Sequence, residues 1–335
     1  MANWLSGYTT RKKITIDKSK IDSDLTDFPV LVKLTSSNFD FSKANSDGYD
    51  IRFTSADGTT LLKYERERHD SDNEVAEYWV KIPSISSSED TIFYIYYRTE
   101  DTADGADPTN VWDSNFKGVW HMKDLTTSTI EDSTSNNNDG TKKAINEPVE
   151  VDGQIAKAQS FDGSNDYIST SWNQLTGNAA RSIEVWFKTG STSDSNWISW
   201  GTNNSNQLSQ VGIWQGGLGY LGYANELTTP ASAYADNAWH HLVVTFDGSA
   251  MKLYLDSVEK NSKSTTLNTG TSNLNIGRSI TVSNYYNGTL DEVRISGVAR
   301  SSAWIKASYY SGNNSLVSYG NEEGIDNAVF FGCNF

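Results

Sequence analysis

Two aspartates stand on one predicted turn, at a spacing that could serve metal chemistry. Asp162 and Asp166 lie four residues apart in the stretch FDGSNDY, whose Gly and Asn residues favour a tight turn. Calcium takes about six to eight oxygen ligands, so a turn with two carboxylates could supply part of its coordination shell. The same pair could instead close an Asx turn, in which a carboxylate accepts hydrogen bonds from the backbone. The residues leave both interpretations open.

A second segment, residues 197–223, is dense in aromatic and amide side chains. Aromatic faces can stack on sugar rings, and amides can bind hydroxyl groups, so this composition favours sugar binding. In a half-buried strand every second residue points inward, so about half of these aromatics should belong to the core. The aromatic residues that we expect to be exposed and to contact a ligand are Trp197, Trp214, Tyr223 and Tyr285.

Signatures of catalysis are scarce. The chain lacks the G-x-S-x-G, H-E-x-x-H, P-loop and paired-cysteine metal motifs. Residues 217–222 match G-x-G-x-x-G, but their flanks alternate as strands do and no helix pattern follows, so the anion-binding helix N-terminus is missing. Two-carboxylate hydrolysis could still use acids that are distant in sequence. We therefore expect the protein not to be an enzyme. Glycoside hydrolysis is a third possibility, after a recognition role and a structural role.

Charge and hydropathy narrow the choice of partners. The net charge of −15 argues against nucleic acid, because phosphate binding needs a surplus of Lys and Arg. No stretch reaches the roughly 18 apolar residues that span a bilayer, so we expect no membrane insertion. The N-terminal residues lack the apolar core of a secretory signal peptide. We therefore expect either that a leader has been removed or that the protein leaves the cell by another route, such as in a virus particle. The single cysteine, Cys333, excludes an intramolecular disulfide framework.

The elements that must position these groups are predicted to be strands. The 25 glycines and five prolines, with many Ser, Thr and Asn residues, favour short strands joined by turns. Residues 301–308 are the best short helical candidate, and residues 99–108 read as a linker. The predicted fold class is all-β, with two β-sandwiches in tandem. The expected boundaries are 1–112 for the first domain, 113–322 for the second, and 323–335 for an apolar C-terminal tail.

The second domain carries an ordered set of motifs. Residues 239–256 alternate as a strand, break at Asp247-Gly248 and resume as a second strand, which predicts a β-hairpin. With FDGSNDY, IEVWF at 183–187 and GTLDEVR at 288–294, the set resembles the laminin-G-like, concanavalin A-type jelly-roll family. The resemblance implies a jelly roll that binds sugars or proteins, and a structural calcium site in which Asp291 would join Asp162 and Asp166. Backbone hydrogen bonding is the alternative role for Asp291.

The first domain has a resemblance of its own. The stretches FPVLV at 28–32, GYDIRF at 48–53, WVKIP at 79–83 and YIYY at 94–97 resemble an uncharacterised prokaryotic β-domain family. Such domains commonly precede laminin-G-like modules, and their function is unknown. The resemblance therefore implies a neighbour for the jelly roll without implying a task for the first domain.

Together these features favour a non-catalytic adhesion or recognition protein. It would bind a glycan or a cell-surface receptor, with structural calcium, at an extracellular, cell-surface or virion-surface location. The alternative is a structural subunit of an extracellular fibre, a surface layer or a virion. In that case the sandwiches and the tail, residues 323–335, would join copies into a homo-oligomer or a larger assembly, because an apolar terminal strand can add to a neighbour's sheet edge.

Overall fold

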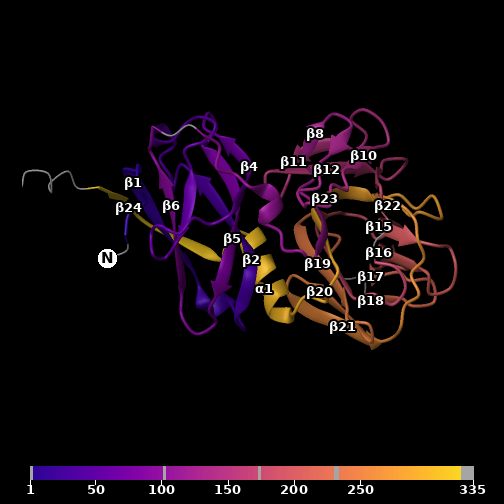
Figure 1. Cartoon of the computed structure of the whole chain (residues 1–335). Helices are drawn as coiled ribbons and strands as arrows, with labels where there is room; N and C mark the ends of the chain where they lie inside the picture. Colours follow the sequence, from indigo (N-terminus) through magenta and orange to yellow (C-terminus); the bar gives the residue numbers. More distant parts are fainter. Residues whose placement is uncertain (1–2, 101–102, 173–174, 230–233, 326–335) are drawn as a thin grey trace, which may run out of the picture. The chain divides into compact units, whose positions relative to one another are not determined.

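The computed structural model describes residues 3–100, 103–172, 175–229 and 234–325, and the chain divides into two compact units (Figure 1). The first unit comprises Met1–Val111 and Tyr310–Phe335, and the second comprises Trp112–Tyr309. Both are built from antiparallel strands, so the predicted all-β fold class is confirmed. Within the described ranges no helix is long and apolar enough to cross a bilayer.

The first unit contains a four-stranded and a three-stranded sheet. Phe53 of the first sheet packs against Tyr64 and Tyr78 of the second, with ring centroids 5.2 and 5.5 Å apart, so the two sheets bury a shared core. Short 3-10 helices span Lys18–Lys20, Phe41–Lys43 and Pro108–Asn110. The strand order is β24 (Val317–Gly324), β1 (Thr10–Ile16), β6 (Thr91–Tyr97) and β3 (Arg52–Ser55) in one sheet, and β2 (Leu25–Thr35), β5 (Val75–Ile85) and β4 (Tyr64–Asp70) in the other.

The last described strand, β24, belongs to the first unit rather than to the second. It pairs antiparallel with β1, from Ile16 opposite Val317 to Thr10 opposite Gly324, and Tyr319 donates its hydroxyl to the carbonyl of Lys33 at 2.8 Å. The expected second domain, 113–322, therefore ends too late. The helix α1 (Ser302–Gly312) carries the chain back to the first unit. Of the predicted tail, residues 326–335 lie outside the described residues.

The second unit is a sandwich of two larger sheets. One sheet has the order β11 (Val149–Asp152), β12 (Lys157–Asp162), β23 (Asn287–Ser296), β14 (Arg181–Lys188), β19 (Trp239–Phe246), β20 (Ala250–Leu255) and β21 (Val258–Ser264), and β7 (Phe116–Trp120) pairs with β23. The other, nine-stranded sheet has the order β18 (Leu227–Thr229), β17 (Gly217–Tyr220), β16 (Leu208–Trp214), β15 (Ser195–Gly201), β22 (Leu274–Ile276), β13 (Ile168–Thr170), β10 (Gly140–Lys142), β9 (Thr129–Ile130) and β8 (Asp124–Thr126).

Apolar side chains from both sheets meet in one core. Alternate residues of β14 point inward, and Phe187 packs against Trp197 of β15 with ring centroids 4.6 Å apart. In β16, Val211 and Ile213 belong to the same core. Because strand side chains alternate, Gln210 and Trp214 of β16 lie on the opposite face of the nine-stranded sheet. The core thus fixes which side chains this sheet offers outward.

Candidate functional site

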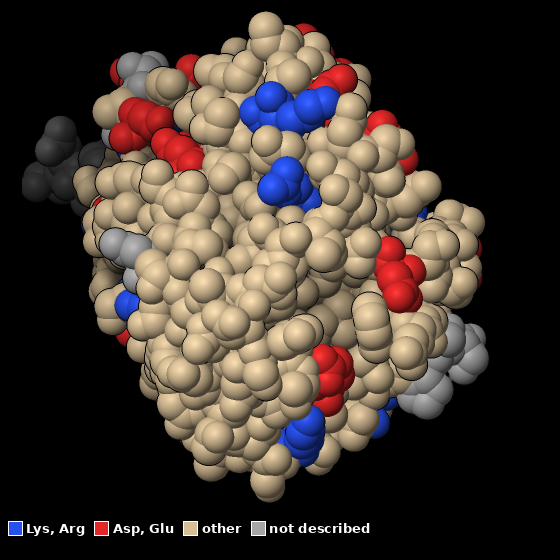
Figure 2. All heavy atoms as spheres, turned by 90° about the vertical axis from the view of Figure 1, so that its right-hand side faces the viewer, with Lys and Arg blue, Asp and Glu red and all other residues tan. Residues whose placement is uncertain are grey.

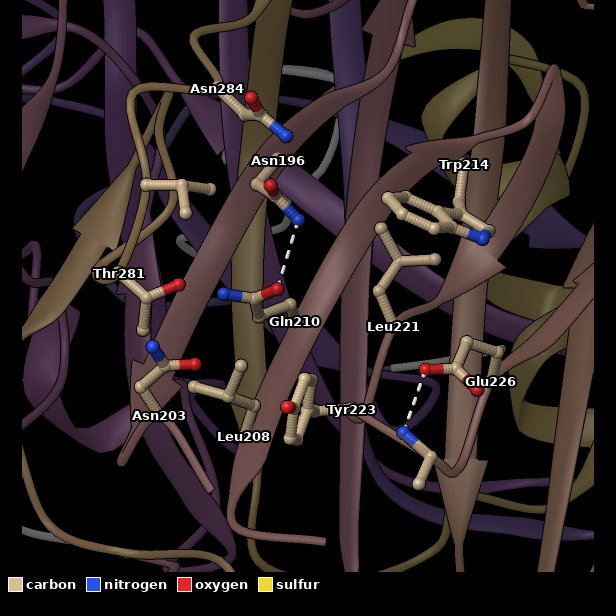
Figure 3. Close-up of a pocket in the computed structure, with 12 residues that line it drawn as sticks. Asn196, Asn203, Leu208, Gln210, Trp214, Leu221, Tyr223, Glu226, Thr281 and Asn284 are labelled. Carbon is tan, nitrogen blue, oxygen red and sulfur yellow. Dashed lines mark hydrogen bonds between the residues drawn. The ribbon is translucent and has the colours of Figure 1, made fainter. Parts of the chain in front are cut away.

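A cavity of about 440 Å³ lies on the outward face of the nine-stranded sheet (Figure 3). Strands β15 and β16 supply its floor, the chain between β17 and β18 supplies one wall, and residues 281–284 supply another. Its volume falls within the range of about 300–1,000 Å³ that is usual for small-molecule sites. The cavity is therefore large enough for a ligand of the size of a mono- or disaccharide.

Two exposed aromatic rings border the cavity. Trp214 is 45% exposed and ends β16, directly before a tight turn in which Gln215 and Gly216 both have positive φ. Such a turn matches the twist of a hairpin and holds Trp214 at its end. Tyr223 is 54% exposed and also lies in the left-handed region, with φ 49°. Leu221 lies between the two rings in Figure 3, so the wall offers an apolar surface with two aromatic faces.

Buried amides form the floor of the cavity. Asn196 of β15 donates its Nδ2 to Oε1 of Gln210 on β16 at 3.0 Å, and Gln210 donates its Nε2 to the hydroxyl of Ser279 at 2.9 Å. The backbone N–H of Thr281 donates to the same hydroxyl at 3.1 Å, so the network reaches the loop that forms the opposite wall. Because Asn196 and Gln210 are buried, these contacts fix the orientation of both amides before any ligand arrives.

The charge at the cavity comes from one side chain. Among the lining residues, Glu226 is charged and none is Lys, Arg or His. Its Oε1 accepts a hydrogen bond from the backbone N–H of Ala224 at 2.9 Å, which ties the carboxylate to the loop that carries Tyr223. Figure 2 views the molecule from the side of Figure 1 that carries β15 to β18, and uncharged side chains cover most of that surface.

Two of the four predicted ligand-binding aromatic residues line the cavity, and two do not. Trp214 and Tyr223 line the cavity, whereas Tyr285 is half-buried, makes a single bridge with Arg278 and is not among the lining residues. The expectation that Trp197 is exposed is wrong, because its ring is 0% exposed within the core. The register of β15 shifts between Asn196 and Ile198, and this irregularity lets Trp197 face inward together with Ile198.

Several lining residues were not predicted. Asn196 and Glu226 lie in the sequence near the aromatic-rich segment, and Asn284 directly precedes Tyr285, but no motif marks them. Gln210 belongs to the amide-rich segment that favoured sugar binding. The pairing of β15 with β22, with Ile198 opposite Ile276, brings the 281–284 loop to the cavity, and this pairing joins segments far apart in the chain.

Asp162 and Asp166 close a turn on their own. Oδ1 of Asp162 accepts from the backbone N–H groups of Ser164 and Asn165, at 2.7 and 3.2 Å, and Oδ2 of Asp166 accepts from the backbone N–H of Asp162 at 3.0 Å. The bond from Ser164 lowers the pKa of the Asp162 carboxyl, and burial raises the pKa of Asp166. These contacts have the geometry of the Asx-turn alternative.

Asp291 lies apart from that turn. It is 0% exposed, and its Oδ2 accepts a hydrogen bond from the backbone N–H of Ile155 at 2.9 Å. Asp162 pairs with Asn287 on β23, so Asp291 lies four residues further along that strand, or about 13 Å. Among the described residues, the three aspartates form no cluster within metal-ligating distance. The structure thus does not bring the predicted ligands together, and calcium binding stays a prediction.

Another group of ionisable side chains comes from β14, β23 and β19 and from the residue that follows β7. Arg294 donates to Oε2 of Glu292 at 2.6 Å and lies 3.6 Å from Oε1 of Glu184, while His241 and His121 contact Glu184 and Glu292 at 3.0 and 2.7 Å. Burial opposes the charged form of both glutamates, but the neighbouring His and Arg groups outweigh it and lower the pKa of each carboxyl. Each carboxylate is therefore held ionised inside a paired network.

Comparison with protein families agrees with this architecture. Residues 162–306 match the model described as the concanavalin A-like lectin/glucanases superfamily, and residues 47–142 match a domain of unknown function, DUF2341. The chain thus carries a concanavalin A-like domain preceded by a domain of unknown function, and both resemblances read from the sequence are confirmed. No curated protein sequence matches the chain.

Solved structures resemble the chain over part of its length. Domain 4 of AbnA, an extracellular GH43 arabinanase from Geobacillus stearothermophilus in complex with arabinotriose, is 22% identical over 57% of this chain and 97% of its own, with a TM-score of 0.47. The binding domain of Paraclostridial Mosquitocidal Protein 1 is 16% identical over 59% of this chain and 52% of its own, with a TM-score of 0.48.

A third similar structure is the ligand binding domain of Botulinum neurotoxin serotype D in complex with N-acetylneuraminic acid. It is 15% identical over 58% of this chain and 50% of its own, with a TM-score of 0.46. The chain thus spans about half the length of each of these two binding-domain chains.

Proposed function

We propose that this chain is a non-catalytic recognition protein that binds glycan in the cavity of its second unit. The observation that carries the proposal is that the exposed rings of Trp214 and Tyr223 border a floor of buried, hydrogen-bonded amides within one cavity. Aromatic faces and fixed amides are the groups that recognise a sugar's apolar ring face and its hydroxyls. The proposal includes an extracellular, cell-surface or virion-surface location.

Binding would follow from preorganisation. The indole of Trp214 would stack on a sugar ring, and the ordered amides would accept or donate hydrogen bonds without first losing conformational freedom. Trp214 offers the larger of the two exposed aromatic rings at the cavity, so we expect affinity to depend strongly on this residue.

A glycan array on the purified chain, run with calcium and again with chelator, tests the proposal. A related set of binding sugars that disappears with Trp214→Ala supports it, whereas an array without signal in both conditions contradicts it. Leu125→Ala is a matched control, because Leu125 is also an exposed apolar residue of the nine-stranded sheet but is not among the cavity's lining residues.

A further inference from the structure

We infer that the cavity selects uncharged saccharides over anionic ones, and that Glu226 sets this preference. The inference rests on the proposed glycan binding and adds the class of sugar to it. It concerns the charge and the hydrogen-bonding character of the groups that line the cavity, rather than the shape of the cavity.

The charge around the cavity disfavours an anion. Glu226 is its charged lining residue, and the lining residues include no Lys, Arg or His that could pair with a carboxylate or sulfate. The nearby ammonium of Lys263 donates to the backbone carbonyl of Glu226 at 3.3 Å and is not part of the lining. An anionic sugar would therefore meet a like charge, and no lining residue is a cation that could offset it; like charges at close range repel.

The hydrogen-bonding groups point to the same preference. Oε1 of Glu226 accepts from the backbone N–H of Ala224, which holds the carboxylate in place while Oε2 remains as a second acceptor. At the floor, Nδ2 of Asn196 gives one of its two N–H groups to Gln210, and its Oδ1 is a further acceptor beside that of Glu226. Acceptors need donors, and sugar hydroxyls supply them, whereas a ligand carboxylate or sulfate supplies only further acceptors.

The matched variant is Glu226→Gln, which removes the charge but keeps an amide oxygen that can accept from Ala224. Glu89→Gln is the control, because Glu89 is an exposed carboxylate of the first unit and its replacement changes the net charge by the same amount. Both substitutions fall on exposed side chains, so thermal unfolding should be unchanged and should serve as the check on folding.

The experiment compares neutral glycans with their sialylated, sulfated or uronate counterparts on one array, for the wild type and both variants. We expect the wild type to bind the charged member of each pair at least tenfold more weakly. Glu226→Gln should bring the ratio of the affinities for the neutral and the charged glycan closer to one, and Glu89→Gln should leave this ratio unchanged. Because the cause is electrostatic, added salt should also narrow the ratio in the wild type.

Equal binding of neutral and anionic members by the wild type would overturn the inference, and so would a ratio that Glu226→Gln leaves unchanged. If Trp214→Ala still abolishes binding in either case, the proposed glycan function survives alone. An array without any signal would contradict the glycan function, and the inference would fall with it.

Discussion

Asn196 and Gln210 are joined by a hydrogen bond of 3.0 Å between Nδ2 and Oε1, and this contact links β15 to β16 beneath the cavity. Both side chains are buried, and Gln210 donates its own Nε2 to the hydroxyl of Ser279. Gln210 is therefore a positioning residue, because it orients Asn196 rather than offering its own amide to a ligand. Hydrogen bonds within the protein thus orient the amide side chains at the floor of the cavity.

This relationship predicts that Gln210 and Asn196 act together. Gln210→Met should weaken glycan binding by releasing Asn196, and Asn196→Ala should weaken it by removing the amide. In a double-mutant cycle on affinity, the double variant should lose less than the sum of the two single losses. Additive losses would contradict the positioning role. Gln210→Met should also lower the free energy of unfolding by about 1–3 kcal/mol, because it leaves a buried amide without its partner.

The two tryptophans of the aromatic-rich segment should behave in opposite ways. Trp197→Ala empties a core site and should lower the free energy of unfolding by about 3–5 kcal/mol. Trp214→Ala removes an exposed ring and should change it by less than about 0.5 kcal/mol. Denaturant unfolding of both variants checks this. Similar effects on stability would mean that the assignment of inner and outer faces of the sheet is wrong.

The position of Asp291 predicts the outcome of a calcium test. Asp291→Ala leaves the buried N–H of Ile155 without its carboxylate acceptor, which should reduce the free energy of unfolding by about 1–3 kcal/mol. If this contact is the whole role of Asp291, the loss is the same in calcium and in chelator, as measured by thermal unfolding. A loss that appears only with calcium would instead support the metal site expected from the sequence.

A histidine at the start of β19 predicts a pH dependence of stability. Nδ1 of His240 lies 2.7 Å from Oδ2 of Asp256, and this hydrogen bond raises the pKa of His240 against the opposing effect of partial burial, with Asp236 adding to the rise. Because folding raises the pKa of His240, its protonated form stabilises the folded protein. This contribution is complete below about pH 6.5, the ordinary histidine pKa, and is lost as the pH rises through the folded pKa.

The unfolding temperature should therefore decrease as the pH rises from about 6.5 through the raised pKa of His240, and His240→Gln should make this decrease smaller. The measurement is a series of thermal unfolding curves for the wild type and the variant across this range. An identical slope with pH in both proteins would show that His240 does not contribute.

Local patterns predicted the parts of the fold that depend on neighbours in sequence. The hairpin broken at Asp247-Gly248 is present as β19 and β20, and the carboxylate of Asp247 accepts from the backbone N–H groups of Ser249 and Ala250 at 2.8 Å each. The helical candidate at 301–308 overlaps α1, which begins one residue later and runs from Ser302 to Gly312. The residues that favour a turn, and the alternation of apolar and polar residues along a strand, are both local in sequence. These elements could therefore be predicted.

The features that were missed depend on contacts distant in sequence. The irregularity in β15 that turns Trp197 inward appears only in its register with β16, and strict alternation would not place Trp197 and Trp200 on one face. The pairing of β24 with β1 joins the two ends of the described chain. Asp291 accepts from Ile155, and no local signal in the sequence links a strand carboxylate to that loop.

Glycan binding in the cavity beside Trp214 can be tested by measuring the affinity of the wild type and of Trp214→Ala for the sugars that an array identifies. We expect at least a tenfold loss of affinity in the variant, about 1.4 kcal/mol, with an unchanged unfolding temperature and with Leu125→Ala binding as the wild type does. Equal affinities for the wild type and Trp214→Ala would contradict it.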